Sequence, residues 1–516
     1  MRKKAYGERV CAQDVFWTYE GAAVPTLRGA SLTVEAGECV VLTGPSGCGK
    51  TTFSRVLNGL APHFYEGVFS GSVFVGGLSV LQAKPHEIAR CVGSVFQDPR
   101  AQFFATTVED EVAFGCENLA LSAEETQARM DWAISAIGAD DVRGRDLFGL
   151  SSGQKQKVAI ASAVAMDPPV LVFDEPSANL DNESAAMLAQ VLARLKALGR
   201  TIVVAEHRLH YLMDVADRVV VMEEGRMTGW MTPREALSMG HAQAVARGLR
   251  MACCAAVPFQ DAARPSAAGS EPAPHVEAAS HVARALEPPA VEARGLSVSH
   301  RCSPVLDGLT FSVAGAGSVV GIVGANGAGK TTLVRTLCGL KAEDAGDVRF
   351  DGETLKPKRR RERVAFVMQD ADYQRFTESV EAELRFARPR TPDLERGIDA
   401  VLGDLGLQAL RGAHPMTLSG GQKQRLTIAC ALTSDARAVF FDEPTSGLDG
   451  ASMRSVARLL RGMARNGRRV FVITHDFEFV ACACDEAFVV AGGRMADRIP
   501  VAEASRSRLM AALGLR

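Results

Sequence analysis

The feature that most constrains this chain is that its sequence repeats itself. Three segments of the first half return in the second half in the same order: GPSGCGKTT from Gly44 as GANGAGKTT from Gly324, LSSGQKQKVAIA from Leu150 as LSGGQKQRLTIA from Leu418, and VLVFDEPSANLD from Val170 as AVFFDEPTSGLD from Ala438. Positions 151 and 174 are 23 residues apart, and so are positions 419 and 442. Such equal spacing indicates a tandem duplication, and 516 residues are enough for two complete copies of one domain.

A segment between the copies, from about Met251 to Pro288, is rich in Ala, Pro and Ser and poor in large apolar side chains. Such a segment cannot bury enough apolar surface to offset its ordering entropy, so we interpret it as a flexible linker. Domain 1 would cover residues 1–250, the linker residues 251–288 and domain 2 residues 289–516. Within each copy short apolar runs alternate with helical patterns, which predicts an α/β fold with a largely parallel sheet.

Composition excludes several classes of protein. Hydrophobic residues make up 47% of the chain and charged residues 23%, as in folded globular proteins. The net charge of -2 gives no general attraction to nucleic acid, and we interpret the one basic run, Lys356 to Arg363, as a solvated loop, with contact to anionic lipid or RNA as the alternative. We expect no membrane-spanning helix, no signal peptide, and reduced cysteines without zinc.

Each copy places a glycine-rich loop between a predicted buried strand and a predicted helix. Glycines let backbone N–H groups approach phosphates, and a helix N-terminus adds favourable partial charge. This pattern predicts ATP bound by Gly44, Pro45, Ser46, Gly47, Cys48, Gly49, Lys50, Thr51 and Thr52 in the first copy, and by Gly324, Ala325, Asn326, Gly327, Ala328, Gly329, Lys330, Thr331 and Thr332 in the second. The lysines would reach the β- and γ-phosphates, and Thr51 and Thr331 would hold Mg²⁺.

An apolar run ends in two adjacent carboxylates in both copies, Asp174–Glu175 in the first and Asp442–Glu443 in the second. Such runs predict central strands, and in open parallel sheets the carboxyl ends of the strands carry function. Asp174 and Asp442 would help to hold Mg²⁺. Glu175 and Glu443 would polarise the water that attacks the phosphate.

Together these motifs resemble those of the ATP-binding cassette (ABC) ATPases, and the resemblance covers both copies. The most diagnostic motif is the signature, LSSGQ in the first copy and LSGGQ in the second. The resemblance implies two tandem P-loop domains, each with a helical signature subdomain, that pair so that each ATP lies between the phosphate loop of one and the signature of the other. The signature residues that would contact ATP are Ser151, Gly153, Ser419 and Gly421.

The resemblance also assigns roles to residues outside the loops. Gln97 and Gln369 fall at the Q-loop, where a glutamine senses Mg²⁺ and the attacking water. His207 and His475 match the switch histidine that contacts the γ-phosphate, and each lies 32 residues after the catalytic glutamate of its copy. Tyr19 matches the aromatic residue that stacks on adenine.

The copies depart from the family pattern at two places. His300 stands where the first copy has Tyr19, and an imidazole is a smaller platform for adenine. Ser152 replaces the first glycine of the signature, which places a side chain where backbone approaches phosphate. Site one would combine Lys50, Gln97, Asp174, Glu175 and His207 with Ser419 and Gly421, and site two Lys330, Gln369, Asp442, Glu443 and His475 with Ser151 and Gly153. Both departures fall on site two, so we predict that it binds or turns over ATP less well.

The segments after the Q-loops indicate the type of ABC protein. Residues 97–119 and 369–387 resemble the corresponding region of energy-coupling factor (ECF) ATPases. This implies an ATPase on the cytoplasmic face of the cell membrane that powers import of a vitamin or transition-metal ion. Its partners would be a transmembrane coupling protein and a small membrane substrate-binding subunit. Asp98 and Asp370 would pair with arginines of the coupling protein, or else act as N-cap or loop carboxylates.

Two other classes stay open. A fused sugar-importer ATPase also joins two cassettes. A second cassette without its catalytic acid would favour that class, but Glu443 is present here. A tandem ABC protein that acts on ribosomes or nucleic acid usually carries a basic arm, a zinc module or a coiled-coil insertion. The linker here is slightly acidic, so we expect no nucleic-acid partner.

Overall fold

The structure is a computed structural model that describes residues 9–259, 290–300, 303–313, 317–368, 376–386, 392–418 and 420–515. The chain divides into two compact units, which we call domain 1 (Met1–Ala256 with Asp449–Ala451) and domain 2 (Val257–Leu448 with Ser452–Arg516). Each is described by itself. No helix in the described part of the chain is long and apolar enough to cross a membrane.

Domain 1 is built on a mixed six-stranded sheet in the order β10-β9-β3-β8-β7-β6. Its strands are β3 (Cys39–Thr43), β6 (Val92–Val95), β7 (Val170–Asp174), β8 (Thr201–Ala205), β9 (Arg218–Glu223) and β10 (Arg226–Met231). Every pairing is parallel except that of β9 with β10. All residues of β3 and β8 are buried, as expected of parallel strands covered on both faces.

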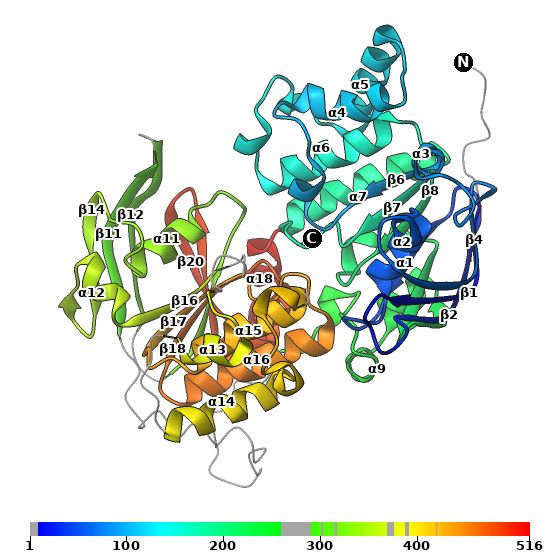
Figure 1. The fold of residues 1–516 in the computed structure, drawn as a ribbon. Helices are drawn as coiled ribbons and strands as arrows, with labels where there is room; N and C mark the ends of the chain where they lie inside the picture. The colour runs from blue at the N-terminus through cyan, green and yellow to red at the C-terminus, as the bar shows by residue number, and fades with distance from the viewer. Residues whose placement is uncertain are drawn as a thin grey trace. The chain divides into compact units, whose positions relative to one another are not determined.

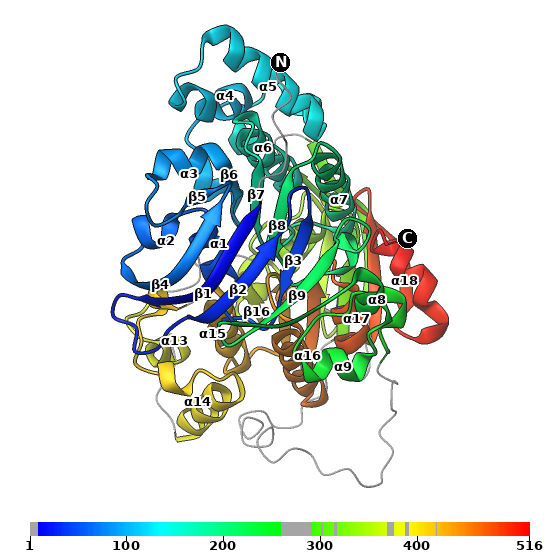
Figure 2. The same cartoon turned by 90° about the vertical axis from the view of Figure 1, so that its right-hand side faces the viewer.

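A second, antiparallel sheet in the order β2-β1-β4-β5 packs against the first. Its strands are β1 (Val10–Tyr19), β2 (Leu27–Val34), β4 (Gly67–Val75) and β5 (Leu78–Ser79). The strands of both sheets and α1 (Lys50–Leu57) can be followed in Figure 2. One hydrophobic core joins them, with Trp17 of β1, Val40 of β3 and Phe53 of α1 all fully buried. This core holds the loop between β3 and α1 in place.

The remaining helices of domain 1 include a helical subdomain. Its members α4 (Val108–Asn118), α5 (Ala123–Ile137) and α6 (Ser152–Ala165) gather at one end of the domain, in cyan in Figure 1. The signature lies at the start of α6. The other helices are α2 (Leu60–His63), α3 (Pro85–Cys91), α7 (Asn182–Ala197), α8 (Pro233–Ser238) and α9 (His241–Ala246).

Domain 2 repeats this architecture. Its sheets have the orders β16-β17-β18-β13-β19-β20 and β12-β11-β14-β15. The strands are β11 (Val291–His300), β12 (Ser303–Val313), β13 (Val319–Val323), β14 (Ala345–Phe350), β15 (Glu353–Thr354), β16 (Val364–Val367), β17 (Ala438–Asp442), β18 (Arg469–Ile473), β19 (Glu486–Ala491) and β20 (Arg494–Pro500). The helices are α11 (Lys330–Leu337), α12 (Pro357–Arg361), α13 (Val380–Arg385), α14 (Pro392–Asp404), α15 (Gly420–Leu432), α16 (Gly450–Arg465), α17 (Phe477–Ala483) and α18 (Arg506–Ala512). The predicted fold class, two tandem α/β domains with largely parallel sheets, is confirmed.

The basic run Lys356 to Arg363 is not the loop that the sequence predicts, but most of its residues are exposed to solvent, as predicted. Most of it forms α12, and Arg360 is fully buried and paired with Glu343. Arg363 pairs with Glu353. Arg360 is the exception to solvation, because Glu343, which is distant in the sequence, supplies its charged partner in the fold.

Most of the predicted linker lies outside the described residues. Its first part, residues 251–259, is described and contains a 3₁₀ helix at Cys254–Ala256. Val257 is buried, and the Phe259 ring packs edge-on against Phe477 of α17. The flexible linker therefore stays a prediction for the residues that follow.

Candidate active site

The loop between β3 and α1 has the conformation that its glycines allow. Gly44, Gly47 and Gly49 have φ values of 152°, 79° and 107°, which residues with a side chain rarely adopt. A Cβ atom on Gly44 would lie 2.0 Å from the carbonyl oxygen of Met222 in β9, so only glycine fits there. A Cβ atom on Gly47 would meet nothing within 4 Å. This part of the loop faces open space in front of a helix N-terminus, which suits a phosphate group.

The loop lysines fold back over their loops. Lys50 is 4% exposed, and its ammonium group donates to the carbonyl oxygens of Gly44 (3.0 Å) and Pro45 (3.2 Å). In domain 2 the ammonium group of Lys330 makes the two corresponding contacts at 2.7 and 2.8 Å. Each phosphate loop therefore carries a positive charge held against its own backbone, where it can move to a bound polyphosphate.

A hydroxyl and a carboxylate meet beside each loop. The Thr51 hydroxyl donates to Asp174 Oδ1 at 3.0 Å, and the Thr331 hydroxyl donates to Asp442 Oδ2 at 3.2 Å. Burial, and then the charge of the adjacent glutamate, raise the pKa of Asp174 and of Asp442 to about 6. These oxygen donors are the type that Mg²⁺ prefers, and a cation would offset the cost of two neighbouring buried carboxylates. The residues present therefore fit a magnesium ion held together with nucleotide phosphates.

The structure brings together three residues of domain 1 that the sequence predicted as catalytic. Glu175 directly follows β7 with a φ of 44°, and its backbone N–H donates to Ala205 of β8 at 2.8 Å. Gln97 Nε2 donates to Glu175 Oε2 at 2.8 Å, and His207 Nε2 lies 3.4 Å from Glu175 Oε1. Burial raises the pKa of the Glu175 carboxyl, but the charge and hydrogen bond of His207 and the charge of Lys50 outweigh it, so the net pKa is lowered.

Domain 2 assembles the corresponding pair. Glu443 has a φ of 50°, and its backbone N–H donates to Ile473 of β18 at 3.0 Å. His475 Nδ1 lies 2.8 Å from Glu443 Oε1. Gln369 lies outside the described residues, so its predicted contact has no structural counterpart here. An acid and an imidazole at the end of neighbouring strands are the groups needed to orient and deprotonate a water molecule.

Tyr19 lies beside the phosphate loop of domain 1. Its hydroxyl is 3.2 Å from the Thr52 hydroxyl and accepts a hydrogen bond from Arg55 at 3.1 Å. Its ring packs edge-on against Trp17 and Tyr65, with ring centroids 5.5 and 6.0 Å away. Arg55, Trp17 and Tyr65 were not predicted from the sequence; only Trp17 had a signal there, since it lies two residues before Tyr19 in the run Phe16-Trp17-Thr18-Tyr19.

The residues at the predicted adenine-stacking position of domain 2 differ from those of domain 1. His300 ends β11 and is exposed. The position that corresponds to Trp17 is Val298, since both lie two residues before the adenine-stacking position. The predicted adenine platform of domain 2 is therefore smaller than the aromatic cluster of domain 1.

The signature of domain 1 forms the N-terminus of α6. Ser151 is the N-cap: its hydroxyl accepts from the Gln154 backbone N–H at 3.3 Å, and the Gln154 side chain accepts from the Ser151 N–H at 3.1 Å. Ser151 and Ser152 are exposed. A Cβ atom on Gly153 would lie 3.0 Å from the Ser184 hydroxyl, which makes this glycine tightly packed. In domain 2, Ser419 lies outside the described residues and Gly421 lies in α15.

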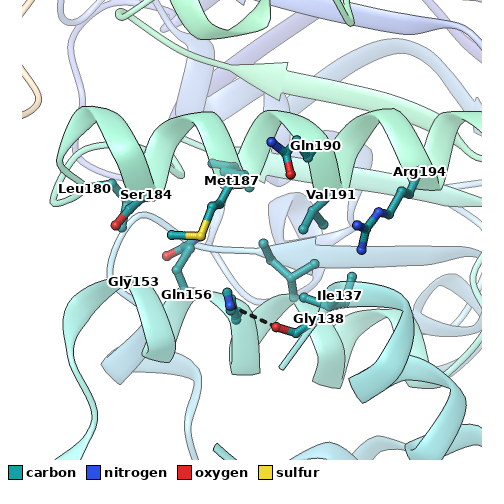
Figure 3. A pocket seen from close by; sticks show the side chains of 13 residues that line it. Ile137, Gly138, Gly153, Gln156, Leu180, Ser184, Met187, Gln190, Val191 and Arg194 are labelled. Carbon is teal, nitrogen blue, oxygen red and sulfur yellow. Dashed lines mark hydrogen bonds between the residues drawn. The ribbon is translucent and has the colours of Figure 1, made fainter. Parts of the chain in front are cut away.

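A cavity of about 140 Å³ lies behind the signature of domain 1, between α5, α6 and α7 (Figure 3). Gly153 and Gln156 of α6 line one wall, and Ser184, Met187 and Arg194 of α7 line another. No residue of the phosphate loop and neither acid of the Asp174–Glu175 pair contributes to it. The candidate active site is therefore the loop and strand edge described above, and not this cavity.

Comparisons with known proteins agree on one family. The family model described as ABC transporter matches residues 27–178 and 306–446. A "Putative ABC transporter ATP-binding protein" of Treponema denticola is 40% identical over 94% of this chain and 96% of its own length. The "Putative HMP/thiamine import ATP-binding protein YkoD" of Bacillus subtilis is 32% identical over 94% of this chain and 90% of its own length.

A solved structure shows the same fold. It is the complex of the archaeal ribosomal stalk protein aP1 and the archaeal ribosome recycling factor aABCE1, in which one chain matches with a TM-score of 0.62 and 22% identity, over 97% of this chain and 92% of that one. The repeated phosphate loops, the signature, the acid–histidine pairs and these relatives lead to one assignment. The chain belongs to the ABC transporter family and is an ATPase with two ATP-binding domains in one polypeptide.

Proposed function

We propose that this ATPase powers an ECF-type importer of a vitamin or a transition-metal ion through a transmembrane coupling protein. The observation that carries the proposal is an exposed pair of aromatic side chains in the segment after the Q-loop of each domain. We call these pairs the aromatic docking pairs: Phe104 with Phe114 in domain 1, and Phe376 with Phe386 in domain 2.

Both docking pairs expose apolar surface to solvent. Phe104 is 75% exposed and stacks on Phe114, with ring centroids 4.9 Å apart. Phe376 is 71% exposed and Phe386 55%, with centroids 6.1 Å apart. A single exposed aromatic residue is ordinary, but two adjacent exposed rings form a contiguous apolar patch of the kind found on interaction surfaces. Because the pairs repeat at the same place in both domains, we infer that one partner contacts both.

A buried glutamate holds each docking pair in place. Glu111 is 1% exposed and accepts the backbone N–H groups of Phe104 and Ala105 at 2.8 and 2.9 Å. Glu383 accepts those of Phe376 and Thr377 at 3.1 and 3.0 Å. A preformed surface loses little conformational freedom on binding, which favours a docking role.

The charges near the Q-loop of domain 1 are already paired within the chain. Asp98 accepts from the Arg100 backbone N–H at 3.0 Å and forms an ion pair with its guanidinium at 2.9 Å. Of the two roles predicted for Asp98, this geometry supports the N-cap. Asp370 lies outside the described residues. We therefore propose that apolar contact with the aromatic docking pairs, more than ion pairing at Asp98, couples the ATPase to its partner.

The proposed chemistry follows from the site residues. Lys50 and Lys330 would bind the phosphates, and Glu175 and Glu443 would orient the attacking water. When bound, Mg²⁺ neutralises charge on the phosphate oxygens. By the ABC resemblance, the two halves would pair and the signature serines would complete the sites. The chain would act at the cytoplasmic face of the membrane.

The relatives favour import over a role on ribosomes. YkoD, at 32% identity, is named for the import of HMP and thiamine, and thiamine is a vitamin. The ribosome recycling factor, at 22% identity, supports only the fold. The slightly acidic composition of the segment between the domains also disfavours a phosphate-rich partner.

The test is to purify the tagged chain from membranes of its own cells and to identify the proteins that co-purify. The proposal expects a coupling protein and a small, very hydrophobic subunit. Both should be lost from the variant Phe104→Ser/Phe376→Ser but kept in Trp230→Ser, a control that changes a 60% exposed aromatic residue on β10. The ATPase activity of the isolated chain should stay the same in all three. Co-purification of ribosomal proteins in place of membrane proteins would refute the proposal.

A further inference from the structure

A buried carboxylate that belongs to none of the motifs lies beside the switch histidine of domain 1. Glu206 is 2% exposed and accepts five hydrogen bonds. Its Oε1 accepts the backbone N–H groups of His207 (2.9 Å) and Arg208 (3.1 Å). Its Oε2 accepts the backbone N–H of Ser177 (3.4 Å) and the hydroxyls of Ser177 (3.1 Å) and Tyr211 (3.0 Å). The carboxylate therefore binds two segments of the chain, one at Ser177 and the other from His207 to Tyr211.

These two segments carry the proposed catalytic pair. Ser177 follows Glu175 by two residues, in the turn where Glu175 takes its left-handed conformation. His207 directly follows Glu206 and directs its ring to Glu175. The carboxylate of Glu206 thus ties the backbone after the acid to the backbone of the histidine. Burial, and then the negative charge of Glu206, raise the pKa of Tyr211, so that its phenol stays a hydrogen-bond donor.

Arg208 extends this network to the turn between β7 and α7. Its guanidinium donates to the carbonyl oxygens of Leu180 at 2.9 Å and Ser177 at 3.5 Å, and to Asn182 Oδ1 at 2.5 Å. Residues 177–182 are therefore bound at both ends to the segment that contains His207. The turn after Glu175 and the switch segment, residues 206–211, thus form one hydrogen-bonded unit.

Domain 2 is built differently at the same place. Its switch segment reads Thr474-His475-Asp476, where domain 1 has Glu-His-Arg, and Phe479 stands at the position of Tyr211. The link there is a hydrogen bond from the Thr445 hydroxyl to Asp476 Oδ2 at 3.2 Å. The fold of a cassette therefore does not require a glutamate before the switch histidine.

We propose that Glu206 is a positioning residue of domain 1, which holds Glu175 and His207 in register for hydrolysis, with Arg208 fixing the turn at residues 177–182. This inference rests on the proposed roles of Glu175 and His207. A glutamine of the same shape offers only one acceptor oxygen, and its NH₂ group faces groups that also donate. At least one buried N–H then loses its acceptor, and the segments must shift to regain one.

The test measures turnover at site one alone, in a Glu443→Gln background. There, Glu206→Gln should lower kcat about tenfold, because small misplacements of catalytic groups cost rate steeply. The affinity for ATP should change less than twofold, since the phosphate loop is untouched. Tyr211→Phe, which removes one donor and keeps the ring, should give a smaller loss of kcat. Glu224→Gln makes the same chemical change at an exposed position of domain 1 and should have no effect.

Three results would overturn the inference: an unchanged kcat in Glu206→Gln, a parallel loss of kcat and ATP affinity, or a Tyr211→Phe variant that loses more activity than Glu206→Gln. Glu175→Gln in the same background separates this failure from failure of the proposed site. If Glu175→Gln abolishes turnover while Glu206→Gln retains it, only the positioning role is wrong. If Glu175→Gln retains turnover, the catalytic role of Glu175 is wrong as well.

Discussion

Nδ1 of His475 lies 2.8 Å from Oε1 of Glu443. In domain 1 the opposite ring nitrogen, Nε2 of His207, faces Glu175 at 3.4 Å. Both domains therefore have an acid and an imidazole in contact at the ends of neighbouring strands. The two contacts differ in length and in the ring nitrogen that faces the acid, and the domains also differ at the residue predicted to stack on adenine and in the residues around the histidine.

The first prediction concerns the adenine platform. Stacking of a base on an aromatic ring contributes about 1–3 kcal/mol, so Tyr19→Ala should weaken ATP binding to domain 1 roughly tenfold. Tyr19→Phe keeps the ring and loses only the contacts with Thr52 and Arg55, so its effect should be small. Equilibrium binding in a Lys330→Ala background isolates domain 1. Equal losses in the two variants would show that the ring does not stack on adenine.

The matching prediction for domain 2 runs in the opposite direction. His300→Tyr should tighten ATP binding there, because it replaces an imidazole by a larger aromatic surface. A Lys50→Ala background isolates this domain. No change in affinity would contradict the view that the smaller platform weakens site two.

The phosphate loop offers a matched pair of glycines. Gly44→Ala would push a Cβ atom to 2.0 Å from the Met222 carbonyl oxygen, whereas Gly47→Ala has open space and bears only the cost of a left-handed residue, about 1–2 kcal/mol. Gly44→Ala should therefore destabilise domain 1 more than Gly47→Ala. The three tryptophans, Trp17, Trp132 and Trp230, all lie in domain 1, so their fluorescence reports its unfolding. Equal unfolding temperatures would contradict the close packing at Gly44.

Metal dependence tests the Thr51–Asp174 pair. Thr51→Val keeps the size of the side chain but removes the hydroxyl that donates to Asp174, so Mg²⁺ should no longer strengthen ATP binding to domain 1. Thr51→Ser keeps the hydroxyl and should retain most of the effect. ATP binding in a Lys330→Ala background is measured with Mg²⁺ and with EDTA. If Mg²⁺ strengthens ATP binding to Thr51→Val as much as it does with Thr51 unsubstituted, Thr51 does not contribute to the metal site.

The Glu343–Arg360 pair predicts a stability change in domain 2. Glu343→Gln leaves the fully buried Arg360 without its charged partner, which should lower the free energy of unfolding by about 3 kcal/mol. The control Arg361→Gln changes an exposed residue of the same helix and should be neutral. Hydrogen exchange of the core strand β13 reports the unfolding of this domain. Similar exchange in both variants would contradict the importance of the pair.

Much of the fold could be predicted because its signals are local. The apolar run before Gly44, the glycines and the helical pattern after Lys50 predict strand, loop and helix in that order, and β3 and α1 confirm it. The duplication likewise predicts that the second half repeats the first, and both sheets recur in the same strand order.

Other features could not be predicted because they depend on contacts distant in the sequence. The burial of Arg360 depends on Glu343, 17 residues away, and a run of basic residues by itself indicates solvent exposure. In the sequence, nothing distinguishes Glu206 from an ordinary surface glutamate. Only the structure shows that it accepts five hydrogen bonds. The difference between EHR in one copy and THD in the other was the one sequence signal that could have pointed to it.

The most direct test of the account is the steady-state ATPase activity of Glu175→Gln and Glu443→Gln, each compared with the unsubstituted chain and with the double variant. Both glutamates contact a histidine, but the Tyr19 cluster and the Glu206 network belong to domain 1. We predict that Glu175→Gln removes the larger share of turnover and that the double variant is inactive. Equal losses in the two single variants would contradict the inequality of the two sites, and turnover by the double variant would contradict the proposed roles of both glutamates.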